Sequence, residues 1–343
     1  MNFQELSPLL NAIIFIAAAA AVWFAGTKLA HYASDIADRT GWGREVLGIL
    51  LLGGVTSLPE LAVATTATLQ GTPVLSINDV LGSASVNIII LAIADALSGR
   101  SALTSVQGSP LLMLQGVLCI LLMAFAAAPT VTGDVGFAGI GVWSWLMLAT
   151  YLLAVRLIAH SNANRAWRPA QGNRSAKESQ EAPGTKGSMR ALILKTTGVG
   201  MTILVAGFLL ARTGQGLAEQ TGLGTSFFGA VFLALATSLP EWSTVIAATR
   251  MGRYEMAISD IFGTNLFNVT ILVFVDALHD GGPIMLEGGP FAAFGALLAL
   301  ALTAFYLVGM LERRDRTFLR MGWDSIAVLM TYCVGVVVLH GLR

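Results

Sequence analysis

The pentapeptide Thr-Ser-Leu-Pro-Glu occupies residues 56–60 and recurs unchanged at residues 237–241, so that each residue is matched 181 positions further along the chain. A shared content of Ala and Leu does not explain a repeated Pro-Glu pair, and the register extends well beyond the motif on both sides. The same offset, without a gap, relates Gly26 to Gly207, Asp79 to Asp260, Gly82 to Gly263, Asn87 to Asn268 and Asp95 to Asp276. The chain therefore contains two copies of one structural unit.

The composition places these units in a membrane. Of the 343 residues, 55% are hydrophobic and only 12% are charged, against about 25% charged residues in an average soluble domain. Mean hydropathy is +0.73. The 20 basic residues are balanced by 20 acidic ones, which leaves no excess of positive charge for binding nucleic acid. These values exclude a cytosolic enzyme, a disordered protein and a nucleic-acid binder, and they are typical of a polytopic membrane protein.

Ten apolar runs are long enough to cross a bilayer, for which a helix needs about 20 residues. We expect spans at 9–32, 46–70, 73–97, 109–128, 136–159, 190–212, 226–249, 254–278, 288–311 and 322–342. The one long polar stretch, 160–189, is rich in Ser, Asn, Gly and Pro and is typical of a flexible linker. The sequence therefore predicts an all-α membrane protein with five helices in residues 1–159 and five in residues 190–343.

The distribution of Lys and Arg predicts the orientation of the spans, because these residues accumulate on the cytoplasmic side. Counted by side, 18 of them fall with the linker and only Arg212 and Arg343 fall on the other side. We therefore expect a cytoplasmic linker and two outward-facing termini. Since each unit has an odd number of spans, the second unit enters the membrane from the opposite side. Inverted repeats of this kind are common in secondary transporters.

Glu60 and Glu241 fall near the middle of the spans 46–70 and 226–249. A charge at that depth is expensive and persists where it binds an ion, exchanges a proton or has a partner. No Lys or Arg lies at a similar depth in any predicted span, so an ion pair is not available. Two carboxylates that meet across a pseudo-twofold axis match a divalent cation, which prefers hard oxygen ligands.

The neighbours of these glutamates supply further oxygen atoms. Pro59 and Pro240 each remove a backbone N–H and crowd the carbonyl group four residues back, which predicts a break in the helix. Unwound backbone at membrane depth is tolerated where it lines a cavity. We expect hydroxyl and amide ligands from Thr56, Ser57, Ser83, Asn87, Thr237, Ser238, Thr264 and Asn268. The set contains neither His nor Cys, which argues against zinc or copper.

Gly82 and Gly263 are expected to let the spans 73–97 and 254–278 approach the broken helices closely. Asp79 and Asp260 stand one turn before these glycines. By topology we place Asp79 on the outer side of the site and Asp260 on the inner side. We predict that both are vestibule residues, which raise the local cation concentration without being direct ligands.

At these residues the sequence resembles the sodium/calcium exchangers of the calcium/cation antiporter superfamily, with prokaryotic members as the nearest type. The family's alpha repeats pair a G-x-S-x-P-E type motif with a G-S-x-x-x-N type motif. Here the pairs are residues 55–60 with 82–87 and residues 236–241 with 263–268. The resemblance is strong over 54–97 and 235–278 and architectural elsewhere. Asp79 and Asp260 depart from it, because many members have Asn at this place in at least one repeat.

The resemblance implies exchange of Ca²⁺ for several Na⁺ by alternating access in a prokaryotic inner or plasma membrane. Glu60 and Glu241 would be shared between a central Ca²⁺ site and neighbouring Na⁺ sites, and the spans 9–32 and 190–212 would slide across the other core helices. K⁺-dependent members carry Asp where this chain has Asn268. With two formal charges in the cavity, we expect no requirement for K⁺.

Two other functions stay open on the sequence alone. An H⁺-coupled antiporter for Ca²⁺ or another cation would use the same carboxylates, and a channel is not excluded, although it has no need of two inverted binding motifs. An enzyme is not expected: the four His residues lie at span ends, in loops or near the C-terminus, and no Gly-x-Gly-Asp motif is present. We expect no cofactor, no nucleic acid and no obligatory protein partner, with Ca²⁺, Na⁺ and lipid as the interacting species.

Overall fold

The computed structural model describes the chain in several stretches that together contain nearly all of the expected spans. The described residues are 6–40, 48–69, 71–97, 103, 109–161, 188–221, 225–312, 317–318 and 321–342. The linker predicted over 160–189 lies almost wholly outside them.

The first unit is helical, with one small antiparallel hairpin. Its helices are α1 (Pro8–Thr40), the π-helix η2 (Gly48–Gly53), α3 (Gly54–Thr56), α4 (Leu58–Leu69), α5 (Pro73–Leu97), α6 (Pro110–Ala127), α7 (Pro129–Thr132) and α8 (Val142–Ser161). Strands β1 (Gly136–Phe137) and β2 (Ile140–Gly141) precede α8.

The second unit repeats the order of the main helices and of the hairpin, and it differs in its short helices. Its helices are α9 (Met189–Thr221), α10 (Thr225–Phe228), the π-helix η5 (Gly229–Leu233), α11 (Ala234–Thr237), α12 (Leu239–Arg250), α13 (Tyr254–Leu278), the 3₁₀ helix η6 (Ile284–Leu286), α14 (Gly289–Glu312) and α15 (Trp323–Leu342). Strands β3 (Thr317–Phe318) and β4 (Met321–Gly322) precede α15.

The offset of 181 residues relates the elements of the two units along their whole length. It carries both ends of α1 onto α9, of α4 onto α12, of α5 onto α13 and of α8 onto α15, and it carries each strand of the first hairpin onto its counterpart. The repeat that the sequence shows between Gly26 and Leu97 is therefore a repeat of the complete five-helix unit.

Each of the ten predicted spans contains a helix where it is described, and the helices differ from the prediction mainly in length. Seven helices of the described residues are continuous, long and apolar enough to cross a membrane, and Val142–Ile158 is a shorter apolar helix. The spans 46–70 and 226–249 are broken, the second with a bend of 44° between Ser226–Thr237 and Leu239–Arg250. Helices α1 and α9, at 33 residues each, run well beyond 9–32 and 190–212.

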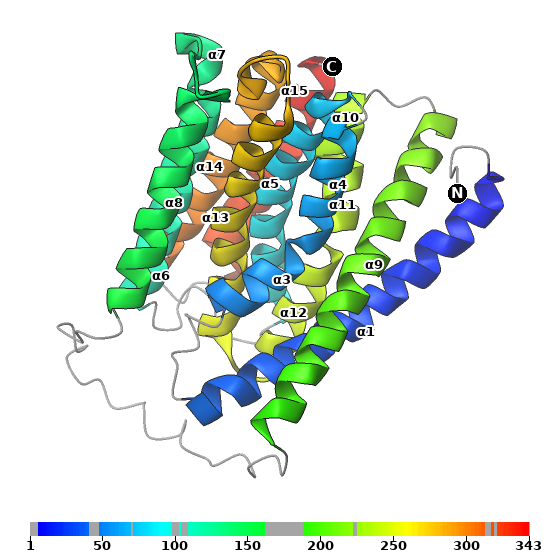
Figure 1. Cartoon of the computed structure of the whole chain (residues 1–343). Coiled ribbons are helices and arrows are strands. Elements are labelled where there is room, and N and C mark those ends of the chain that lie inside the picture. The colour runs from blue at the N-terminus through cyan, green and yellow to red at the C-terminus, as the bar shows by residue number, and fades with distance from the viewer. Residues whose placement is uncertain are drawn as a thin grey trace.

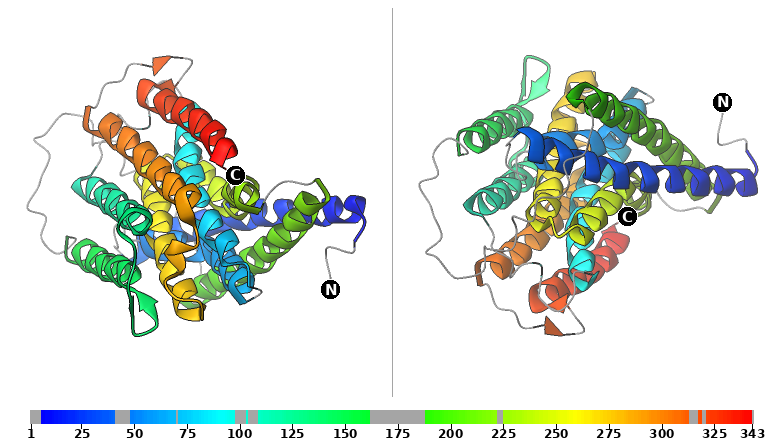
Figure 2. Two further views of the ribbon diagram at one scale, coloured as in Figure 1. Left: turned by 90° about the horizontal axis from the view of Figure 1, so that it is seen from above. Right: turned by 90° about the horizontal axis from the view of Figure 1, so that it is seen from below.

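Helices α5 and α13 form the centre of the molecule, and α1 and α9 lie together as a tilted pair on one side (Figures 1 and 2). Nearly every residue of α5 is buried. Its polar residues, which include Asp79, Ser83 and Asn87, are therefore enclosed by other helices and do not form an exposed face. The end of α8 and the start of α9, which flank the linker, lie at the opposite end of the bundle from both chain ends (Figure 1). This arrangement agrees with the inverted topology.

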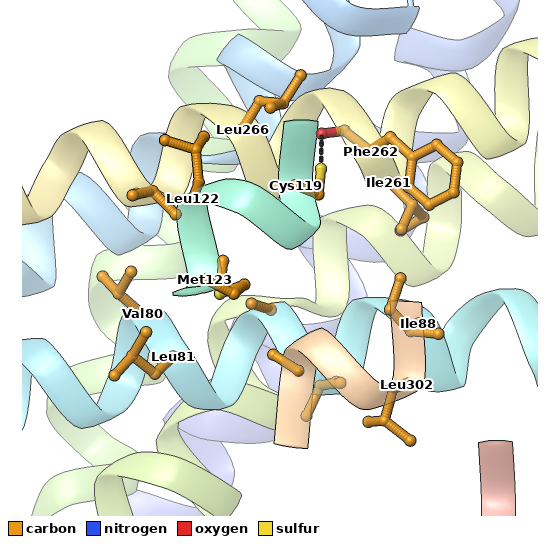
Figure 3. Packing of buried hydrophobic residues seen from close by; sticks show 14 of the residues in the cluster. Val80, Leu81, Ile88, Cys119, Leu122, Met123, Ile261, Phe262, Leu266 and Leu302 are labelled. Atoms are coloured by element: carbon orange, nitrogen blue, oxygen red, sulfur yellow. Dashed lines mark hydrogen bonds between the residues drawn. The ribbon is translucent and has the colours of Figure 1, made fainter. Parts of the chain in front are cut away.

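Apolar side chains join the central pair to α6 and α14 (Figure 3). Leu122 and Met123 of α6 lie between α5 and α13, and Leu302 of α14 lies near Ile88. The Cys119 thiol donates to the carbonyl oxygen of Phe262 at 3.4 Å. Cys119 is thus an ordinary buried core residue, as its apolar surroundings in the sequence suggest.

Helices α1 and α9 cross the core at two repeat-related glycines. A Cβ atom at Gly26 of α1 would overlap the Ser243 hydroxyl group of α12, and one at Gly207 of α9 would overlap the Pro59 ring of α4. Small residues of this kind allow helix backbones to approach closely in a membrane. Each crossing point therefore lies beside one of the two Pro-Glu segments.

Two buried aspartates each accept hydrogen bonds from the opposite unit. Asp276 of α13 accepts hydrogen bonds from Gly141 N at 2.9 Å and from the Ser144 hydroxyl at 2.5 Å, both at the start of α8. Asp95 of α5 accepts from Gly322 N at 2.7 Å and from the Ser325 hydroxyl at 2.8 Å, at the start of α15. A carboxylate is favourable at a helix N-terminus, where N–H groups lack partners. The offset of 181 residues relates the two aspartates in the sequence, but no sequence pattern indicates that each accepts hydrogen bonds at a helix start of the other unit.

Replacing Asp276 by Asn should destabilise the protein without changing a cation ligand. Each hydrogen bond to a carboxylate is worth about 1.5–3 kcal/mol, so Asp276→Asn should lower the Tm of the purified protein by several degrees. Asp95→Asn should have a similar effect, because its contacts are the same. The control is Asp280→Asn, an exposed aspartate near the end of α13. A Tm for Asp276→Asn equal to that of the control would show that the cross-unit contact is not stabilising.

Candidate functional site

Both Pro-Glu segments lie at interruptions of a helix. The π-helix η2 and the short α3 end at Thr56, and α4 begins again at Leu58; η5, α11 and α12 repeat this pattern around Ser238. The proline-dependent break predicted from the sequence is therefore present in both units. The π-helices that precede the breaks are not marked by any residue pattern we recognised, although such segments are frequent at functional sites.

Glu60 and Glu241 are completely buried, each in the first turn after a break. None of their four carboxylate oxygens has a hydrogen-bond partner among the described residues. The two carboxyl groups lie within electrostatic range of each other. A threonine of the opposite unit lies near each glutamate, Thr237 near Glu60 and Thr56 near Glu241. Lone carboxylates in this position leave oxygen atoms free to bind a cation.

Hydroxyl groups connect the two units around the glutamates. Thr56 Oγ1 lies 3.3 Å from Thr264 Oγ1, and Ser83 Oγ lies 3.2 Å from Thr237 Oγ1. The offset of 181 residues converts one pair into the other, so these contacts are the two halves of one symmetric arrangement. The structure therefore brings four of the eight predicted hydroxyl and amide ligands together in pairs.

Close backbone contacts bring these pairs together, as the sequence predicted for the two glycines. A Cβ atom at Gly82 of α5 would overlap the backbone of Ala230 in η5. On the other side, Gly53 of η2 lies against the backbone of Gly263 and Thr264 in α13. Each central helix is thus in direct backbone contact with the interrupted helix of the opposite unit.

The serines and asparagines of the predicted set differ between the units. Ser57 donates to the carbonyl oxygen of Gly53 at 2.7 Å, whereas the buried Ser238 hydroxyl has no hydrogen-bond partner in the described part of the chain. The amide of Asn87 donates to Asn265 Oδ1 at 2.9 Å, and neither amide atom of Asn268 is hydrogen-bonded among the described residues. Asn265, which sequence reasoning did not select, also donates to the carbonyl oxygen of Ala84. Asn265 could have been selected from the sequence, because it lies between the predicted ligands Thr264 and Asn268.

Asp79 and Asp260, which the sequence predicts to be vestibule residues, are enclosed in this structure. Both side chains are fully buried. Thr237 donates to Asp79 Oδ1 at 3.3 Å, and Thr244 donates to Asp260 Oδ2. Glu60 lies within electrostatic range of Asp79, and Glu241 of both aspartates. The centre of the molecule therefore holds four buried carboxyl groups, and the expectation that K⁺ is not required stays a prediction.

The chemistry of the site is that of hard oxygen ligands. The buried polar set contains carboxylates, hydroxyls and amides, and no Lys, Arg or His is buried among the described residues. Over the same part of the chain, no three acidic, His or Cys side chains converge closely enough to hold one metal ion by themselves. An ion here would combine one or two carboxylates with neutral oxygens, as Ca²⁺ and Na⁺ do readily.

Comparison with known proteins identifies relatives of this arrangement. The family model described as sodium/calcium exchanger protein matches residues 10–159 and 193–340. The chain is 25% identical to the inner membrane protein YrbG of Escherichia coli over 80% of this chain and 82% of that protein. It is 22% identical to the sodium/calcium exchanger MaX1 of Methanosarcina acetivorans, over 90% and 92%. A solved structure of the sodium-calcium exchanger NCX_Mj superposes with a TM-score of 0.65 at 17% identity, covering 96% and 99% of the chains.

The contrast between Asn268 and Asn87 predicts different effects of the same substitution. Asn87→Ala leaves Asn265 Oδ1 without its donor and should cost about 1–3 kcal/mol of stability. Asn268→Ala removes no hydrogen bond of the described residues, so its Tm in ion-free buffer should be close to wild type. Because Asn268 is predicted to bind the cation, Asn268→Ala should reduce the rise in Tm on adding Ca²⁺. A full Ca²⁺-dependent rise in Asn268→Ala would show that Asn268 is not a ligand.

Proposed function

The chain belongs to the sodium/calcium exchanger protein family, and from this premise we propose that it exchanges Ca²⁺ for Na⁺ by alternating access. As a member of this family it is a multi-pass membrane protein and a cation exchanger, and not an enzyme. The relative MaX1 is named a sodium/calcium exchanger, and the sodium-calcium exchanger NCX_Mj has the same fold. These names support the choice of Na⁺ as the coupling ion.

The proposal rests on the burial of two glutamates at equivalent positions. Glu60 and Glu241 are buried, lie at equivalent positions of two inverted units and have no hydrogen-bond partner among the described residues. Two such charges match one Ca²⁺ or two Na⁺ in the same place, since either load compensates them. The two cargoes therefore exclude each other by sharing the same carboxylates, which is the requirement for obligatory exchange.

The remaining predicted residues fit this role as neutral ligands. Thr56, Thr237, Ser83 and Thr264 bring hydroxyl oxygens from both units, and Asn268 and Ser238 bring unpartnered polar atoms. A site built from two units is accessible from either side when the units change their contacts. In our proposal, α1 and α9 move across α12 and α4 at the Gly26 and Gly207 crossing points and expose the site alternately.

An H⁺-coupled antiporter is the second candidate, because Asp79 and Asp260 add two buried carboxylates to the glutamate pair. The two functions are separated by the driving gradient. Purified protein is reconstituted into liposomes, and Ca²⁺ uptake is followed with an outward Na⁺ gradient at equal pH, or with a pH gradient in Na⁺-free choline buffer. We expect uptake with the Na⁺ gradient. Uptake driven only by the pH gradient would favour the second candidate.

Loss of either glutamate charge should abolish Na⁺-driven Ca²⁺ flux. Glu60→Gln and Glu241→Gln keep the shape of the side chain but halve the charge of the pair, so Ca²⁺ is no longer compensated. The matched control is Glu287→Gln, the same chemical change at an exposed glutamate that pairs with His279. The control should transport normally. Flux near the wild-type rate in either of the first two variants would contradict the proposed site.

A further inference from the structure

Asn265 of α13 joins the two central helices at matched positions of the repeat. The offset of 181 residues relates Asn265 to Ala84 of α5. The Asn265 amide donates to the backbone carbonyl oxygen of Ala84 at 3.1 Å, and Asn265 Oδ1 accepts from the Asn87 amide at 2.9 Å. All three residues are buried. One side chain of α13 therefore contacts both the backbone of α5 and a predicted cation ligand.

These two hydrogen bonds fix the orientation of the Asn87 amide. A backbone carbonyl oxygen can only accept, so the NH₂ group of Asn265 faces Ala84. Asn265 Oδ1 then faces Asn87 and also can only accept, so the NH₂ group of Asn87 faces Asn265. Asn87 Oδ1 is left over, buried and without a hydrogen-bond partner among the described residues. An amide oxygen of this kind is a hard ligand for a cation such as Ca²⁺.

Asn87 lies on the face of α5 that meets the opposite unit. It follows Ser83 by four residues, so both side chains project from one face of the helix. Ser83 Oγ lies 3.2 Å from Thr237 Oγ1 of the opposite unit, and Thr237 lies near Glu60. The Asn87 amide therefore belongs to the same polar cluster as the ligands proposed around Glu60.

The second unit has no counterpart of this contact. The residue matched to Asn265 is Ala84, whose side chain has no polar atom. Asn268, which is matched to Asn87, has neither amide atom hydrogen-bonded within the described stretches of the chain. The Asn87 amide is therefore held in one orientation, whereas the Asn268 amide is not held by a hydrogen bond there.

We propose that Asn265 is a positioning residue of the cation site, which turns the oxygen of Asn87 toward the bound ion without touching the ion itself. The inference rests on the proposed exchange function. Without Asn265, the NH₂ group of Asn87 loses its acceptor and competes for the glutamate oxygens, since hydrogen bonds to a carboxylate are stronger than those to a neutral group. A cation would have to displace this contact before binding. Contacts that orient a ligand in this way change the affinity of metal sites.

The test is a double-mutant cycle on equilibrium Ca²⁺ binding to the purified full-length chain in Na⁺-free choline buffer. Asn265→Ala should weaken Ca²⁺ binding about fivefold, which is the contribution of one ordinary hydrogen bond. In the Asn87→Ala background the same change should leave the Kd unaltered, because no amide remains to be oriented. The Tm should fall with Asn265→Ala in both backgrounds, since the Ala84 carbonyl oxygen loses its donor in each. A purely structural role would therefore lower the Tm without this coupling in the Kd.

The matched control is Asn268→Ala. It should change the Kd by one factor whether or not Asn265 is replaced, because Asn265 holds neither atom of the Asn268 amide. Coupling of Asn265→Ala with Asn268→Ala would overturn the assignment, as would an equal loss of affinity from Asn265→Ala with and without Asn87. Unchanged Ca²⁺ binding in Asn265→Ala would also overturn it. Absence of Ca²⁺ binding to the wild-type chain would instead contradict the proposed function.

Two further variants test the inference if Asn265→Ala does not fold. Asn265→Leu fills the space of the amide without an acceptor, whereas Asn265→Asp retains an oxygen that accepts from Asn87. The factor by which Asn87→Ala weakens Ca²⁺ binding should be about fivefold smaller in the Asn265→Leu background than in wild type. It should keep its wild-type value in the Asn265→Asp background, where comparison within one background cancels the effect of the added charge. Equal factors in the two backgrounds would contradict the positioning role.

Discussion

The burial of negative charge without a protein cation is the constraint on which the centre of this molecule depends. Glu60, Glu241, Asp79 and Asp260 are all fully enclosed, and an uncompensated charge in such surroundings is strongly unfavourable. Hydroxyl groups reach the two aspartates but leave the glutamate oxygens unpartnered. In our proposal the transported cations compensate these charges, so that cation binding stabilises the folded protein.

The two units support this centre through exchanged contacts. Each unit gives the other a threonine near its glutamate, a backbone contact at Gly53 or Gly82, and a helix start to be held by Asp95 or Asp276. The aspartate contacts lie at the ends of α5 and α13 and fix the bundle, whereas α1 and α9 pack along the interrupted helices and approach them most closely at Gly26 and Gly207. In our proposal the central bundle is the fixed part, and α1 and α9 are the part that moves during alternating access.

Much of this arrangement could be predicted because sequence patterns that are ambiguous when they occur once become informative when they recur in both units. A single Pro-Glu pair in an apolar run is ambiguous, but two in one register predicted the inverted units, both helix breaks and the close approach at Gly82. The burial of Asp79 and Asp260 was missed. Topology predicts on which side of the membrane a helix ends, but it does not predict which side chains near that end are covered by neighbouring helices. The role of Asn265 and the Thr244 contact of Asp260 were missed for a related reason: the second unit departs from the first at these positions, and only packing shows the consequence.

The central claim is that one set of carboxylates holds either Ca²⁺ or Na⁺. The most direct measurement is equilibrium binding of Ca²⁺ to the purified full-length chain while Na⁺ is raised at constant ionic strength with choline as the replacement ion. The account predicts that Ca²⁺ binds in the absence of Na⁺ and is displaced by Na⁺ with a Hill coefficient above one, because more than one Na⁺ replaces each Ca²⁺. Ca²⁺ binding that persists at saturating Na⁺ would contradict a shared site.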